Sequence, residues 1–197
     1  MVSQRIIGLT GGIACGKSLG ADYLQRTYGL PILDADRLAR EAVEPGTWIH
    51  GAIIERYGSN IILGDGSLDR RQLAQIIFRD AGERSWLEQL IHPYVGDRLV
   101  KLTQAIAEPV IVWVVPLLFE ARMTGLVTEI WVVACPESLQ RQRLIARDRL
   151  SLEDANARIR SQMPLTEKIA QANHVLWNDG EPDALYAAID QAWHSHH

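Results

Sequence analysis

Cysteine is scarce in this sequence: only Cys15 and Cys135 occur among 197 residues. Two cysteines so far apart match neither a disulfide framework nor a zinc-binding pattern, and they suit a reducing compartment, so we expect a cytoplasmic protein. Long hydrophobic runs are also absent, since the longest, residues 110–119, is far shorter than the roughly 20 residues that span a bilayer. The N-terminal MVSQRIIGLTGG turns glycine-rich too early for a signal peptide. We therefore expect no membrane partner.

The sequence also lacks an excess of basic residues. Lys and Arg number 20 against 24 Asp and Glu, which gives a net charge of −4 at pH 7. Proteins that coat nucleic acid usually carry a basic excess, so no nucleic-acid partner is expected. Hydrophobic residues make up 47% and charged residues 22%, which is typical of a globular domain and excludes wholesale disorder. We expect a single domain that is a monomer or a weak homo-oligomer.

Apolar runs alternate with helical patterns along the chain, and no repeat or Pro/Gly-rich linker interrupts them. This alternation is typical of a parallel sheet covered by helices, so the predicted fold class is α/β. The nearly all β-branched run 110–115 suits a central strand that is covered on both faces. Strands are predicted at 5–10, 31–34, 110–115, 130–135 and 174–177, and helices at 16–28, 37–44 and 183–193.

Two longer stretches depart from simple alternation. Residues 45–108 look mostly helical and are too long for one crossover, so they predict a helical lobe beside the sheet. Residues 136–172 are rich in arginine and predict a second, lid-like helical segment. The nucleotide-binding core would then comprise residues 1–44, 109–135 and 173–197.

The strongest motif is GGIACGKS at residues 11–18, which satisfies the phosphate-loop pattern G-x-x-x-x-G-K-[ST]. Its glycines let backbone amides approach phosphate closely, and the dipole of the following helix adds to the attraction for an anion. Lys17 would reach the β- and γ-phosphates of ATP, and the Ser18 hydroxyl would bind Mg²⁺. A chance glycine-rich turn is disfavoured because a strand precedes the motif and an amphipathic helix follows it. The predicted nucleotide-binding residues are Gly11, Gly12, Ile13, Ala14, Cys15, Gly16, Lys17, Ser18 and Leu19.

Cys15 lies inside this loop, where a helix N-terminus can lower the pKa of a thiol. One interpretation is a redox switch or an alkylation site. The other, which we favour, is a small side chain that the loop tolerates.

Several signatures of other nucleotide-binding proteins are missing. The strand at 110–115 runs into PLLFE without a terminal Asp, and no guanine-reading N-K-x-D occurs. These absences argue against a GTP switch and against a motor ATPase. Asp34 and Asp36 instead follow the second predicted strand, at the sheet edge that faces the ligand in open α/β folds. Either could cap the next helix, but we take Asp34 as the better cap and Asp36 as the better catalytic base.

Arginines gather in the predicted lid. Arg143 and Arg147 are four residues apart and would share one helix face. A mobile arginine lid neutralises charge on a phosphoryl group during transfer, and this is the interpretation we favour for the group. The alternative is a solvated helix with ion pairs to Glu137, Glu153 and Asp154.

These residues together resemble the dephospho-CoA kinase family, whose members catalyse the last step of coenzyme A biosynthesis. The resemblance covers residues 5–190 and implies a three-layer P-loop kinase fold with a helical CoA-binding lobe and a helical lid. ATP would phosphorylate the 3′-hydroxyl of dephospho-CoA, to give coenzyme A and ADP. The matching segments are IGLTGGIACGKS, LDADRLAREAVEPG, LIHPYV, VPLLFE, RLIARD, SQMPLTEK and WNDG.

The resemblance also implies roles for individual residues. Lys17, Asp36 and Arg147 match the family's catalytic groups, with Asp36 as base for the 3′-hydroxyl. Asn178 matches a position near adenine, although a plain turn residue is the alternative. The residues that match the acceptor side are Asp36, Arg40, His92, Leu117 and Glu120.

Some features leave alternatives open. His92 precedes Pro93 and could be a packed helix histidine. Cys15 and Leu19 stand where the family commonly has Ser or Thr, and Trp177 is an unusual neighbour for Asn178. A kinase for a nucleoside, nucleotide or sugar acid is the nearest competing function, and a nucleotide-dependent binding protein is a more distant one.

Overall fold

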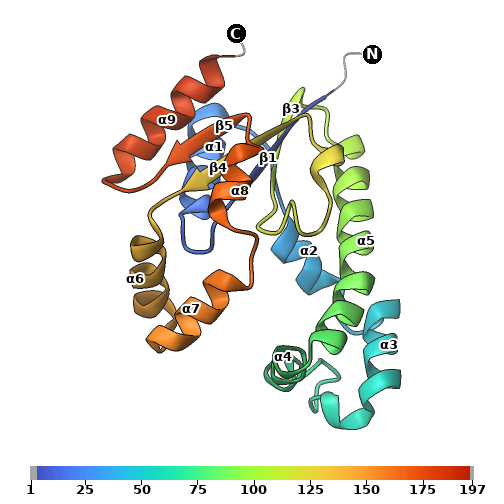
Figure 1. Cartoon of the computed structure of the whole chain (residues 1–197). Coiled ribbons are helices and arrows are strands. Elements are labelled where there is room, and N and C mark those ends of the chain that lie inside the picture. The colour runs from blue at the N-terminus through green and yellow to red at the C-terminus, as the bar shows by residue number, and fades with distance from the viewer. Residues whose placement is uncertain (1–3, 196–197) are drawn as a thin grey trace. The chain divides into compact units, whose positions relative to one another are not determined.

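The computed structural model describes residues 4–195, and within them the chain builds one sheet of parallel strands (Figure 1). The strand order is β2-β3-β1-β4-β5. The long crossovers between parallel neighbours agree with the alternation of strands and helices in the sequence. The strands are β1 (Arg5–Gly11), β2 (Ile32–Asp34), β3 (Val110–Val114), β4 (Glu129–Ala134) and β5 (His174–Trp177).

Each predicted strand is present, with ends that differ from the prediction by one residue at most. The predicted helix at 37–44 differs more, since α2 begins at Ala35, directly after β2, and ends at Glu41. Asp36 therefore lies in the first turn of α2 rather than before the helix. The first and last predicted helices correspond to α1 (Lys17–Tyr28) and α9 (Pro182–His194).

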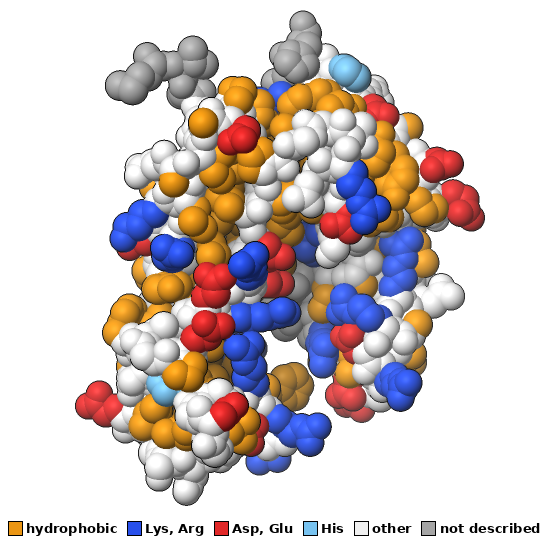
Figure 2. All heavy atoms as spheres, turned by 180° about the vertical axis from the view of Figure 1, so that it is seen from behind, with side chains coloured by type: hydrophobic (Ala, Val, Ile, Leu, Met, Phe, Trp, Pro, Cys, Tyr) orange, Lys and Arg blue, Asp and Glu red, His pale blue; other side chains and the backbone are white. Residues whose placement is uncertain are grey.

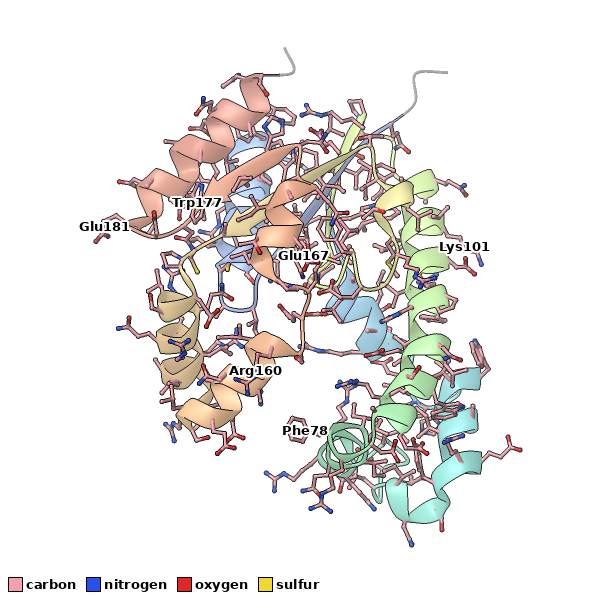
Figure 3. The ribbon with its side chains drawn as sticks, in the orientation of Figure 1. Phe78, Lys101, Arg160, Glu167, Trp177 and Glu181 are labelled. Carbon is pink, nitrogen blue, oxygen red and sulfur yellow. The ribbon has the colours of Figure 1, made fainter. Side chains whose placement is uncertain are left out.

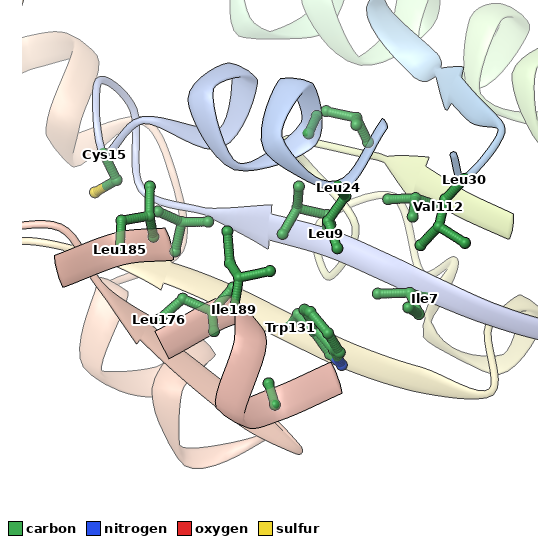
Figure 4. Packing of buried hydrophobic residues seen from close by; sticks show 14 of the residues in the cluster. Ile7, Leu9, Cys15, Leu24, Leu30, Val112, Trp131, Leu176, Leu185 and Ile189 are labelled. Atoms are coloured by element: carbon green, nitrogen blue, oxygen red, sulfur yellow. The ribbon is translucent and has the colours of Figure 1, made fainter. Parts of the chain in front are cut away.

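The chain divides into two compact units, residues 1–34 with 103–197, and residues 35–102. The first unit contains the sheet. Its hydrophobic core packs α1 and α9 against strand residues such as Leu9 and Trp131 (Figure 4). The strands read as continuous apolar runs because a parallel sheet is covered on both faces. The further helices of this unit are η2 (Thr124–Leu126), α6 (Glu137–Asp148), α7 (Leu152–Arg160) and α8 (Leu165–Ala170).

The second unit is helical and has a core of its own, which includes Ile49, Ile53 and Leu73. The Thr47 hydroxyl accepts from the backbone N–H of His50 at the start of α3, and the Asp69 carboxylate caps α4 in the same way. Its elements are α2 (Ala35–Glu41), α3 (Trp48–Tyr57), η1 (Ser59–Ile61), α4 (Arg70–Arg79) and most of α5 (Ala81–Ala105). The division of the chain into core, lobe and lid stays a prediction.

None of the helices between residues 4 and 195 combines the length and apolar character needed to cross a bilayer.

Candidate nucleotide and phosphoryl-transfer site

The loop between β1 and α1 has the backbone that its glycines predict. Gly11, Ala14 and Gly16 have positive φ angles of 148°, 58° and 98°. A Cβ atom on Gly11 would lie 2.1 Å from the carbonyl oxygen of Val133, and one on Gly16 would lie 2.1 Å from Nδ2 of Asn178. Both positions therefore require glycine, for conformation and for space.

Lys17 and Ser18 open α1 at the end of this loop. The Lys17 ammonium group donates to the carbonyl oxygens of Gly11 and Gly12, at 3.2 and 2.9 Å, so it lies folded over the loop. Gly16 is the N-cap of α1, and no side chain among the described residues caps the helix. The N-terminus of a helix attracts an anion. A cation, helical amides and an exposed hydroxyl thus meet where a polyphosphate would bind.

Asn178 ties the loop to the carboxyl end of β5. Its side chain is buried, and Nδ2 donates to the carbonyl oxygen of Cys15 at 2.7 Å. Its backbone N–H donates to Ala134, and its carbonyl accepts from Arg143 on α6. Asn178 therefore holds the loop in shape, and its predicted adenine contact stays a prediction. The adjacent Trp177 is 47% exposed (Figure 3).

Cys15 and Cys135 are both buried, and their sulfur atoms lie 3.4 Å apart. The hydrogen bond from Cys135 and the nearby Lys17 charge lower the pKa of Cys15, against the opposing effect of burial. That hydrogen bond and burial raise the pKa of the Cys135 thiol. A buried side chain in contact with the core suits the interpretation of Cys15 as a tolerated small residue.

Ser18 fits the predicted metal. Its hydroxyl is exposed in the first turn of α1, beside the loop that would hold the phosphates. Mg²⁺ usually keeps several waters and takes only one or two protein oxygens plus substrate phosphates. Residues 4–195 contain no cluster of three or more His, Cys, Asp or Glu side chains that could hold a metal ion, and the role of Ser18 stays a prediction.

Most of the predicted acceptor residues follow β2 or β3 in the sequence. Asp34 ends β2 opposite Val114 of β3, and Asp36 and Arg40 follow on α2. After β3, Leu117 is half-buried and Glu120 lies in a turn. Oε1 of Glu120 accepts from the backbone N–H of Met163 at 2.9 Å and pairs with the Lys168 ammonium group at 2.8 Å. Its Oε2 is buried and has no hydrogen-bond partner among the described residues.

His92 lies half-buried on α5, directly before Pro93, which is accommodated inside this helix. His92 belongs to the second unit, as do Asp36 and Arg40. All three are predicted to bind the acceptor.

Three arginines of α6 and α7 form ion pairs, namely Arg141, Arg147 and Arg158. Arg147 donates to both carboxylate oxygens of Asp148, at 2.7 and 3.0 Å, and Arg158 also reaches Asp148. The bound guanidinium group lowers the pKa of Asp148, and the carboxylate raises that of Arg147. Arg141 pairs with Glu137, as the solvated-helix alternative expected. For Arg147 the partner is Asp148, which that alternative did not name.

A model of the dephospho-CoA kinase family matches residues 5–183, which include the phosphate loop, the acceptor-side loop and the arginine helices. The chain belongs to this family. It is thus a dephospho-CoA kinase by family, an enzyme that uses ATP to phosphorylate dephospho-CoA.

Relatives and solved structures agree with this assignment. The dephospho-CoA kinase of Nostoc sp. is 53% identical over 191 residues, which cover 97% of each chain. That of Thermosynechococcus vestitus is 52% identical and covers 95% of this chain and 92% of its own. The structure of TT1252 from Thermus thermophilus is 36% identical, with a TM-score of 0.83 over 98% of both chains. A shikimate kinase from Acinetobacter baumannii, 16% identical, shares only the fold, with a TM-score of 0.57 over 99% of this chain and 96% of its own.

The predicted family, P-loop kinase fold, kinase activity and ATP co-substrate with Mg²⁺ are therefore confirmed. In this dephospho-CoA kinase the first unit brings together Lys17, Ser18, Asn178 and the loop backbone, while Asp36, Arg40 and His92 belong to the second unit.

Sequence reasoning missed three side chains at this site. Gln162 contacts the phosphate loop, Lys168 neutralises Glu120, and Asp148 holds two arginines. The first two lie in the segment SQMPLTEK, whose match to the dephospho-CoA kinase family was the only signal for them.

Proposed function

We propose that this dephospho-CoA kinase transfers the γ-phosphoryl group of ATP to the 3′-hydroxyl of dephospho-CoA at the carboxyl edge of its sheet. The observation that carries the proposal is the loop geometry: positive-φ glycines, the N-terminus of α1 directly after the loop, and a lysine that lies over the loop. Phosphoryl transfer needs little covalent chemistry from the protein, so catalysis rests on positioning and on charge neutralisation.

On the donor side, the amides of the loop and the Lys17 ammonium group hold the β- and γ-phosphates. Lys17 exchanges its two carbonyl partners for phosphate oxygens, which is favourable because the new hydrogen bonds are charge-assisted at both ends. Ser18 is the residue that would hold Mg²⁺, which when bound neutralises charge on the phosphate oxygens. Asn178 holds the loop through its hydrogen bond to the Cys15 carbonyl and lies near the adenine.

On the acceptor side, Asp36 accepts the proton of the 3′-hydroxyl, and Arg40, one helical turn later, binds an acceptor phosphate. Supporting this, Asp36 follows the carboxyl end of β2 by two residues, and all strands end at the same edge. Leu117, Glu120 and His92 complete the acceptor side. The buried Oε2 of Glu120 supports this placement, because an unpaired buried acceptor calls for a donor from a ligand.

Arg147 serves the transferring phosphoryl group when the lid closes. In the present arrangement its guanidinium group is held by Asp148 and its side chain is 59% exposed. An exposed ion pair contributes little free energy, so leaving Asp148 for a phosphoryl group costs little. Closure excludes water and suppresses hydrolysis of ATP.

The kinase works in the cytoplasm on small molecules, as a monomer or weak homo-oligomer, and has no nucleic-acid partner. Supporting the last point, the net charge at pH 7 is −4, whereas proteins that coat nucleic acid usually carry a basic excess. Figure 2 shows acidic as well as basic side chains on one face.

An ADP-release assay with ATP, Mg²⁺ and dephospho-CoA tests the function, with the product identified by mass spectrometry. We expect coenzyme A to form and turnover to stop when dephospho-CoA is omitted. ATP binding without coenzyme A formation would remove the substrate assignment. Turnover with a nucleoside, nucleotide or sugar acid, but not with dephospho-CoA, would favour the competing kinase function.

A further inference from the structure

The sheet has its topological switch point between β1 and β3. The chain leaves β1 for β2 on one side of β3, and later leaves β3 for β4 on the other side of β1. Ligands of open α/β sheets bind in the crevice at such a point, outside the carboxyl ends of the strands. Here the loop after β1 is the phosphate loop, and the loop after β3 carries Glu120.

The segment between α7 and α8 contacts both of these loops. It lies between Arg160 and Glu167, which Figure 3 labels. Oε1 of Gln162 accepts from the backbone N–H of Ile13 in the phosphate loop at 3.0 Å. The next residue, Met163, donates its backbone N–H to Glu120 at 2.9 Å. Gln162 thus contacts the phosphate loop after β1, and Met163 contacts the loop after β3. These two loops flank the switch-point crevice.

Buried contacts hold this segment in place. Lys168 on α8 is fully buried, pairs with Glu120 at 2.8 Å and donates to the carbonyl oxygen of Pro116 at 3.3 Å. The Thr10 hydroxyl, just before the phosphate loop, donates to the same carbonyl at 3.3 Å. Gln162 is therefore positioned by the two loops that flank the crevice.

The carboxamide of Gln162 uses only part of its hydrogen-bonding capacity. Because Ile13 N–H is a donor, the atom that faces it must be the carboxamide oxygen. The amide nitrogen Nε2 is bonded to the same carbon as this oxygen, so it also lies beside Ile13 of the phosphate loop. It carries two N–H donors. Nε2 makes no hydrogen bond within residues 4–195.

We propose that Gln162 binds the γ-phosphate of ATP, with Oε1 anchored on Ile13 and Nε2 donating to a terminal phosphate oxygen. This rests on the proposed role of the phosphate loop as the ATP donor site. A neutral donor at this point adds affinity only when a third phosphate is present, so Gln162 favours ATP over ADP. A hydrogen bond to a charged group is worth about 10-fold to 100-fold in affinity.

Calorimetric titration of the full chain with a non-hydrolysable ATP analogue and with ADP, each with Mg²⁺, tests the proposal. Gln162→Met removes both polar atoms at nearly constant volume. We expect it to weaken binding of the analogue by at least about tenfold more than binding of ADP. Gln162→Glu keeps the acceptor for Ile13 and removes the donors, so it should also weaken the analogue selectively. Gln171→Met is the matched control, because the side chain of Gln171 donates to the carbonyl of Glu167 on α8, and it should change neither affinity.

Equal losses for the analogue and ADP in Gln162→Met would overturn the proposal and leave Gln162 a structural tie. Unchanged affinities in Gln162→Met would overturn it as well, whatever Gln162→Glu does, since the glutamate adds charge of its own. If the unaltered chain bound neither nucleotide, the proposed donor site itself would fail, which is a different result from unselective binding by the variant.

Discussion

At the scale of single residues, the ammonium group of Lys17 is the donor that the loop presents to phosphate. It bonds two loop carbonyls, at 3.2 and 2.9 Å, and these are replaceable partners. We expect Lys17→Met to lower kcat by about 100-fold or more, in the range found for loss of one electrostatic donor. Initial rates with saturating substrates measure this. An unchanged melting temperature would show that the fold is retained, and a variant with near-normal kcat would contradict the role of Lys17.

The residues of the phosphate loop could be predicted because their chemistry is local. Glycine is required at Gly11 and Gly16 by backbone angles and by close neighbours, and Lys17 and Ser18 follow at fixed spacing. Gln162 could not be predicted this way, because its partner Ile13 is 149 positions away. No rule of sequence spacing predicts which distant residue a half-buried glutamine contacts.

At the scale of elements, α8 is fastened to the loop after β3 by one buried ion pair. Lys168 is fully buried, and its partner Glu120 is 22% exposed. Removing one member of a buried pair leaves the other uncompensated, which costs about 3–5 kcal/mol. We expect Lys168→Met to lower the free energy of unfolding by about this amount in urea titrations.

Lys101→Met, at an exposed position on α5 (Figure 3), is the control and should change stability by less than about 0.5 kcal/mol. The double variant Lys168→Met with Glu120→Gln should recover part of the loss, because no unpaired charge remains. A double variant that loses the sum of the two single effects would contradict this coupling.

Two helices of the second unit are joined by a carboxylate. Glu83 on α5 accepts from Arg56 and from the Tyr57 hydroxyl on α3, at distances of 2.6 to 2.8 Å. These partners lower the pKa of Glu83 from 4.5 to about 2. Since the folded-state pKa lies below the unfolded value, the contribution is present above the ordinary pKa and is lost as the pH falls towards 2.

Glu83→Gln should therefore be less stable than the unaltered chain near neutral pH, and the difference should shrink between about pH 5 and pH 2. Urea unfolding at several pH values measures it, with Glu55→Gln, exposed on α3, as control. A stability difference that stays constant over this range would contradict the assignment of the pKa shift to Glu83.

The elements themselves were the most predictable level of structure. Apolar β-branched runs placed the strands, because a parallel sheet buries both faces. The start of α2 was less predictable: the helix was expected to begin at residue 37, but it begins at Ala35, directly after Asp34 ends β2. The burial of Lys168 was not predictable from the sequence, since lysine is almost never fully buried unless it is paired, and its partner Glu120 is far away along the chain.

At the scale of the whole molecule, nucleotide binding is coupled to folding. A ligand present at 100 times its Kd adds about 2.7 kcal/mol to the free energy of unfolding. For a chain of this size that corresponds to a rise in Tm of roughly 5–10 °C. We expect ATP with Mg²⁺ to produce this shift and Lys17→Met to lose most of it. An equal shift in Lys17→Met would mean that ATP binds elsewhere.

The substrate was predictable only through the resemblance to a family. Composition and the loop motif indicate a kinase of some small molecule, and the shikimate kinase fold shows how widely that architecture is shared. The segments LDADRLAREAVEPG and VPLLFE and the His92-Pro93 pair narrow the choice of acceptor through their match to the dephospho-CoA kinase family. Contacts between distant segments, such as Glu120 with Lys168, follow only from the folded chain.

The most direct test of the proposed chemistry is the turnover of Asp36→Asn beside that of Asp34→Asn, with binding of both substrates measured on the same preparations. We predict that Asp36→Asn loses about 10²–10⁴ in kcat, the usual worth of a positioned base, while its Kd values for ATP and dephospho-CoA stay within about threefold. Asp34→Asn should lose far less. Near-normal turnover of Asp36→Asn, or a larger loss in Asp34→Asn, would contradict the assignment of Asp36 as the base.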